Sequence, residues 1–245
     1  MVKYICFRVS RNTLWIVDEL VIKGCYPSPR DCFKAAINIL TFFLMGLTDN
    51  TTCLTRFIEN LRKEISNSIG DFLDKGIKST KCLKVIDLSA NIANKTVELG
   101  LFKDASDYVS LAMKLLIFFL SCFKNIYNEI FAGKLDPINT SPGDMFERLA
   151  IVLNGLIECP EKLITVIKNF GELFKRYLRH GDVILEDYDE GFLMGEKTRD
   201  LVKRLVEVGA FNNETGFIDF AQTFYTFILY YYSPEPRGPY DLLDP

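Results

Sequence analysis

Hydrogen-bonding and apolar side chains alternate over residues 3–9. The first set is Tyr4, Cys6 and Arg8, and the second set is Ile5, Phe7 and Val9. A period of two predicts a β-strand with one apolar face and one face presented outward. On the outward face, Arg8 can donate two parallel hydrogen bonds to a guanine. Two plainer interpretations stay open: a basic side chain on a strand is usually only solvated, and Cys6 can be a small filler against a partner.

Other chemistry finds little support in the sequence. The chain has one histidine, His180, and no nucleophile motif or phosphate-binding loop, which argues against an enzyme. We therefore expect no catalytic residues, no cofactor and no metal. The seven cysteines are odd in number and form no C-x-x-C pair, so we interpret them as reduced core residues of a cytoplasmic protein.

The strand is followed by the signals of two helices. Ser10 can cap a first helix that ends at Gly24, where a glycine supplies a C-terminal stop. Residues 28–31 then read Ser-Pro-Arg-Asp, which places a capping serine, a proline at the first helical position and an acid at the third. We predict a second helix from there through Leu40.

This order of one strand and two helices resembles the ribbon-helix-helix family of DNA-binding proteins. The resemblance covers residues 1–44 and rests on "FRVS" at the strand end, "VDELV" in the first helix and "GCYPS" before the second. It implies that two units pair their strands into an antiparallel ribbon whose outer side chains read bases in the major groove. The implied DNA-binding residues are Tyr4, Cys6, Arg8, Arg11, Ser28, Arg30 and Lys34, and the implied dimer core is Ile5, Phe7 and Val9.

Charge favours DNA contact only at the N-terminus. The whole chain has a net charge of −3, but residues 1–40 hold six Lys or Arg against three acids. The rest of the chain therefore carries the excess of acids, and any contact with double-stranded DNA should be confined to the N-terminal unit. The longest apolar runs are too short to cross a membrane.

Beyond residue 44 the periodicity predicts an all-helical domain over 45–232 and a proline-rich tail over 233–245. At a constant offset of 76, Val21, Gly24, Asp31 and Phe43 meet identical residues at Val97, Gly100, Asp107 and Phe119. Segments 44–120 and 153–229 also correspond, at an offset of 109, so internal duplication is one interpretation. Chance similarity between Phe- and Leu-rich helices is the other.

We predict a mainly α-helical, sequence-specific DNA-binding protein, a transcriptional regulator. Residues 80–86 look like a poor partner strand, so we expect a homodimer formed through the N-terminal strands. In the second copy the outward strand positions are Thr80, Cys82 and Lys84, but Lys81 interrupts the apolar face. We therefore assign the helical domain to packing and to contact with a protein partner. The alternative function is a helical interaction or assembly protein whose units no longer bind DNA.

Overall fold

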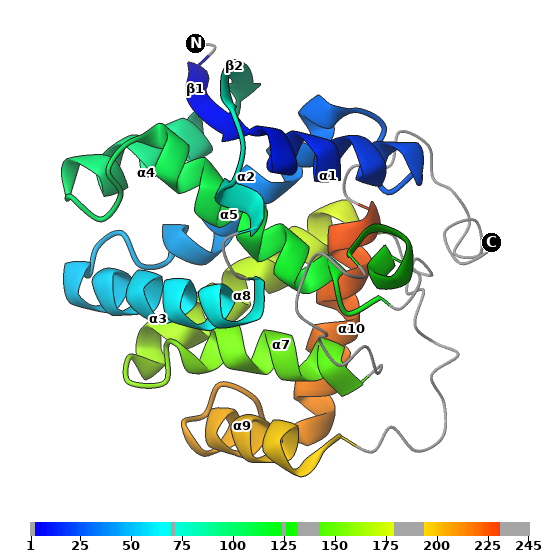
Figure 1. Cartoon of the computed structure of the whole chain (residues 1–245). Helices are drawn as coiled ribbons and strands as arrows, with labels where there is room; N and C mark the ends of the chain where they lie inside the picture. The colour runs from blue at the N-terminus through cyan, green and yellow to red at the C-terminus, as the bar shows by residue number, and fades with distance from the viewer. Residues whose placement is uncertain (1–2, 70–71, 124–125, 132–142, 179–193, 231–245) are drawn as a thin grey trace.

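The computed structural model describes residues 3–69, 72–123, 126–131, 143–178 and 194–230. It is mainly helical, with one two-stranded antiparallel sheet, as the sequence predicted. The sheet lies at one end of the molecule and helix α9 lies at the opposite end (Figure 1). No helix in the described segments is long and apolar enough to cross a membrane.

The N-terminal unit has the elements that the sequence predicts. Strand β1 (Lys3–Ser10) leads into α1 (Arg11–Ile22), and α2 (Pro29–Met45) follows. The Ser10 side chain accepts a hydrogen bond from the Thr13 amide at 3.1 Å and so caps α1. Gly24 adopts a φ of 75°, a left-handed conformation in which a glycine is favoured after a helix. Ser28 caps α2, and Pro29 is its first residue.

The same three elements recur 76 residues later. Helix α3 (Thr51–Ile69) and a short 3₁₀ turn (Phe72–Asp74) connect the first unit to β2 (Lys78–Val85), α4 (Asp87–Glu98) and α5 (Ala105–Leu120). Helices α4 and α5 begin 76 residues after α1 and α2, and Asp104 stands at the capping position that corresponds to Ser28. Gly100 has a φ of 72°, like its counterpart Gly24. The second copy therefore keeps the local structure of the first.

Strands β1 and β2 pair in a register that relates the two copies by a local twofold axis. Cys6 is opposite Cys82, which is its own counterpart at the 76-residue spacing. On one side of this pair Tyr4 is opposite Lys84, and on the other side Arg8 is opposite Thr80. Lys84 is the counterpart of Arg8, and Thr80 is the counterpart of Tyr4. A twofold rotation through the Cys6–Cys82 pair therefore carries each of these cross-strand pairs onto the position of the other. One chain thus holds two βαα units arranged as a pseudosymmetric pair.

Pairing within the chain corrects one expectation. Residues 80–86 looked like a poor partner for β1, but β2 pairs with β1 along its whole length. On the other edge of β1, the Arg8 amide donates a hydrogen bond to Ser106 Oγ at the start of α5, at 3.0 Å. Strand β1 therefore has a partner strand inside the chain, and the reason for expecting a homodimer through this strand no longer holds. The homodimer through the N-terminal strands is an untested prediction that has lost this support.

The downstream helices repeat the second half of the pattern. After a π-helical turn (Tyr127–Phe131) come α7 (Gly143–Asn154), α8 (Pro160–Tyr177), α9 (Glu196–Glu207) and α10 (Glu214–Tyr230). Helices α8, α9 and α10 begin 109 residues after α3, α4 and α5 respectively, the offset found in the sequence. Gly209, with a φ of 76°, again follows a helix end. The segment that would correspond to β2 in this repeat lies almost entirely outside the described residues, and the predicted tail 233–245 lies wholly outside them.

One hydrophobic core joins the N-terminal unit to the rest. Phe43 of α2 and its counterpart Phe119 of α5 stack with ring centroids 6.3 Å apart, close to the local twofold axis. Phe170 of α8 and Phe224 of α10 pack against Phe43 at 4.8 and 6.0 Å. All four rings are fully buried. The boundary predicted at residue 44 therefore coincides with the end of α2 but does not divide the core, and Ile5, Phe7 and Val9 belong to this same core.

Candidate nucleic-acid interface

The face of the β1–β2 ribbon that points away from the core presents side chains of both strands. Its exposed residues form three cross-strand pairs: Tyr4 with Lys84, Cys6 with Cys82, and Arg8 with Thr80. Tyr4 is 64% exposed, and the inward residues of β1 are buried, so the predicted orientation of the first strand is confirmed. We call these six side chains the outer face of the ribbon.

The ribbon is strongly basic. Its sixteen residues include five Lys or Arg and no acid, although the chain as a whole is acidic. Lys78 and Lys81 are exposed beside the outer face, and Lys81 is exposed despite its position on the inward register. A basic two-stranded ribbon is an electrostatic platform for a polyanion. The prediction from the sequence did not include the basic residues of β2, because it assigned the second copy to packing.

The centre of the outer face is a disulfide. Cys6 and Cys82 are bonded, and their Cα atoms are 4.1 Å apart, the short separation of a non-hydrogen-bonded antiparallel pair. Cys6 therefore cannot act as a thiol that contacts a base, which corrects its assignment as a free DNA-binding side chain. The equality of the 76-residue offset with the spacing of Cys6 and Cys82 was the signal in the sequence for this pairing.

A second disulfide joins Cys53 at the start of α3 to Cys159 just before α8. The interpretation of the cysteines as reduced core residues is therefore wrong for four of the seven. It holds for Cys32 and Cys122, which are buried and lie outside both disulfides, while Cys25 also lies outside them but is only half-buried. Burial raises the pKa of the Cys32 thiol well above its ordinary value, so this group stays protonated and unreactive. Disulfides are typical of oxidising compartments, and they remove the cysteine argument for a cytoplasmic location.

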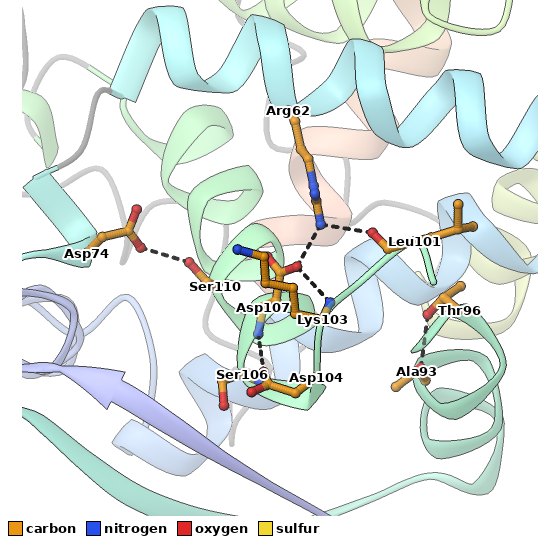
Figure 2. A network of polar contacts seen from close by, with 10 residues as sticks. All are labelled: Arg62, Asp74, Ala93, Thr96, Leu101, Lys103, Asp104, Ser106, Asp107 and Ser110. Carbon is orange, nitrogen blue, oxygen red and sulfur yellow. Dashed lines mark hydrogen bonds and ion pairs between the residues drawn. The ribbon is translucent and has the colours of Figure 1, made fainter. Parts of the chain in front are cut away.

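Arg8 lies at the end of the outer face next to the start of α5. Its Nη2 atom is 3.7 Å from Asp104 Oδ2, and both side chains are about half exposed or more. Asp104 caps α5 by accepting hydrogen bonds from the amides of Asp107 at 3.0 Å and Ser106 at 2.7 Å (Figure 2). The hydrogen bond from the Asp107 amide is the largest influence that lowers the pKa of Asp104, so a negative charge stands beside Arg8 at neutral pH.

The start of α5 is held in place by a polar network. Arg62 of α3 donates to Asp107 Oδ2 at 2.9 Å and to the Leu101 carbonyl at 3.0 Å, as Figure 2 shows. Asp74 accepts from Ser110 at 3.0 Å and from Lys114 at 2.6 Å. These contacts join α3 and the 3₁₀ turn to α5 and to Leu101, which precedes α5. They fix where Asp104 stands relative to the ribbon.

A cavity of about 370 Å³ lies between this end of the ribbon and α5. Its lining includes three basic residues, Arg8, Lys78 and Lys103, and three acids, Asp74, Asp104 and Asp107. The opposite charges offset one another, so the cavity is not a selective site for an anion or a cation. The three acids reduce the positive potential at the Arg8 end of the ribbon.

Helix α2 also contacts β2, and the predicted phosphate-binding residues lie in its first turns. Ser28 accepts a hydrogen bond from the Asp31 amide at 3.3 Å and donates one to the Asp31 carboxylate at 2.6 Å. Arg30 is exposed, and Lys34 lies 3.5 Å from Asp31. Arg11, the first residue of α1, is also exposed. The predicted DNA-binding residues thus lie in two groups, on the outer face and at the helix starts.

Within the described segments, no three His, Cys, Asp or Glu side chains gather where they could hold a metal ion. No protein-family model matches the chain, and neither the curated proteins nor the solved structures contain a match to it.

Proposed function

We propose that the chain is a sequence-specific DNA-binding protein that inserts the β1–β2 ribbon into the major groove of double-stranded DNA. In this proposal one chain supplies both halves of a ribbon-helix-helix pair, which the family forms from two chains. The observation that carries the proposal is the β1–β2 ribbon itself: two strands related by a local twofold axis, with five basic residues and no acid among their sixteen residues. Regulation of transcription is the role that such binding would serve.

The dimensions and chemistry of the ribbon suit this groove. The major groove of B-DNA is about 12 Å wide and admits a two-stranded ribbon. Arg8 can bind the O6 and N7 atoms of a guanine, and Lys84 occupies the position related to Arg8 by the local twofold axis. Arg11, Arg30 and Lys34 would contact phosphates, which gives affinity without sequence preference.

The test is fluorescence anisotropy with a duplex selected from a random library and a scrambled duplex, at several salt concentrations. Arg8→Ala should weaken binding to the selected duplex by about 1–3 kcal/mol and relax preference at one position. Arg30→Ala or Lys34→Ala should weaken binding to both duplexes alike and lower the salt slope by about one.

The matched controls are Arg199→Ala and Lys203→Ala on α9, at the end of the molecule farthest from the ribbon (Figure 1). Both side chains are exposed, and their removal should leave the affinity and the salt slope close to the wild-type values. If Arg8→Ala behaves like these controls, the ribbon does not read DNA. The proposal also fails if no duplex binds at low salt.

The second candidate function is protein interaction or assembly through the same face. It is favoured by the disulfide at the centre, where a DNA reader would carry a hydrogen-bonding side chain, and by the exposed ring of Tyr4. In that case Tyr4→Ala would abolish capture of a protein partner while duplex DNA would not compete for the face. The helical part of the chain would supply further partner contacts under either function.

A further inference from the structure

We infer that the ribbon recognises a non-palindromic DNA site in one fixed orientation, and that Asp104 weakens the contact made by the Arg8 end. The inference rests on the proposed function and goes beyond it, because it specifies the symmetry of the ligand. It follows from the differences between the two units that the local twofold axis relates.

The outer face has different side chains on its two sides. A symmetric pair of identical units would present Tyr4 and Arg8 in each half and would read an inverted repeat. In this chain one half presents Tyr4 with Lys84, and the other presents Arg8 with Thr80. Arginine binds guanine with two parallel hydrogen bonds, whereas lysine is a point charge, so the two halves prefer different bases.

The central pair cannot restore symmetry by reading the middle of the site. The disulfide between Cys6 and Cys82 uses both thiols and offers no N–H or O–H donor to a base edge. The recognised sequence should therefore consist of two dissimilar informative halves with an uninformative centre. The Arg8 half should prefer guanine.

Charge also differs between the two ends. The local twofold axis assigns to the Lys84 end the residues at positions 27, 28, 30, 31 and 34, which are Pro, Ser, Arg, Asp and Lys, with a net charge of +1. Their counterparts beside the Arg8 end are Lys103, Asp104, Ser106, Asp107 and Ser110, with a net charge of −1. Asp104 is the member of this second group that pairs with Arg8, at 3.7 Å. It both competes with DNA for Arg8 and repels nearby phosphates.

Two reciprocal substitutions isolate this effect and keep a favourable capping residue at each helix start. Asp104→Ser gives the Arg8 end the residue of the Lys84 end, and Ser28→Asp does the reverse. Serine and aspartate are both favourable capping residues, so both variants should fold like the wild type, which circular dichroism would check. We expect Asp104→Ser to bind the selected duplex about two- to five-fold more tightly at low salt, and Ser28→Asp to bind it more weakly by a similar factor.

The experiment selects binding sites for the wild-type chain from a random duplex library and then measures both variants on the selected duplex by anisotropy. A non-palindromic consensus, with opposite effects of the two substitutions, supports the inference. A palindromic consensus, or affinities unchanged by both substitutions, overturns it and leaves DNA binding intact. Recovery of no duplex by the wild-type chain at low salt removes the proposed function, and the inference falls with it.

Discussion

Removal of either disulfide should destabilise the folded chain strongly. The bonds link residues 76 and 106 positions apart, Cys6 with Cys82 and Cys53 with Cys159. In the chain-entropy model, closing loops of these lengths lowers the entropy of the unfolded chain enough to stabilise the fold by about 4.5 and about 4.8 kcal/mol. The loops overlap, so the two contributions are not additive.

The variants are the two pairwise replacements Cys6→Ser with Cys82→Ser and Cys53→Ser with Cys159→Ser. Cys6 and Cys82 are exposed, so serine adds little cost there and the first pair reports the loss of the crosslink alone. Cys53 is only 7% exposed, so the second pair also buries a hydroxyl and should cost more. Guanidinium unfolding followed by circular dichroism measures both, with the oxidised wild-type chain as reference.

Order of reduction provides the internal control. Exposed disulfides are reduced more readily than enclosed ones, so a mild thiol reductant should open Cys6–Cys82 before Cys53–Cys159, as peptide mapping of alkylated samples would show. Wild-type protein purified without reductant should contain three free thiols. Seven free thiols, or serine variants as stable as the wild type, would refute the reasoning.

Two further predictions concern the core and pH. Phe43→Ala should lower the free energy of unfolding by about 3–5 kcal/mol, because it removes a fully buried ring at the junction of α2, α5, α8 and α10. The control is Ile22→Ala, whose side chain is 74% exposed. It should change the free energy of unfolding by less than about 0.5 kcal/mol in the same denaturant titration. Equal effects of the two substitutions would contradict this packing. The pKa of Asp104 is lower in the folded chain than in the unfolded chain, so its contribution to stability is present above the unfolded pKa and is lost as pH falls below about 4. Asp104→Asn should therefore lose less stability than the wild type between pH 5 and pH 2. An identical pH dependence of the two unfolding free energies would show that the charged Asp104 carboxylate does not stabilise the start of α5.

Much of the local structure could be predicted because its signals lie within a few residues. Ser10 and Ser28 cap helices where the sequence placed them, and Gly24 and Gly100 end helices in the left-handed conformation. Alternation over β1 correctly divided buried from exposed side chains. The spacing of 76 residues also recurs in the bounds of the helices. The caps, the glycine stops and the alternation depend on short-range geometry, whereas the spacing is a repeat in the sequence itself.

The partner of β1 could not be predicted, because strand pairing depends on contacts distant in the sequence. Lys81 broke the alternation of β2 and made that segment look unsuitable, yet the strand tolerates it as an exposed side chain. The 76-residue offset marks Cys6 and Cys82 as counterparts, but it indicates a disulfide only once β1 and β2 are known to pair, and no comparable signal relates Cys53 to Cys159. The role of Asp104 also depended on its position beside Arg8, which only the three-dimensional arrangement reveals.

The claim that one chain supplies the complete DNA-binding ribbon is tested most directly by the stoichiometry of the complex. Sedimentation velocity of a fluorescent duplex of about 20 base pairs, titrated with the intact 28.1 kDa chain, measures the mass bound to each duplex. If one chain supplies both strands, the complex should contain one chain per duplex at the lowest protein concentrations that give binding. A first complex that contains two chains, or a duplex that sediments unchanged at low salt, would contradict it.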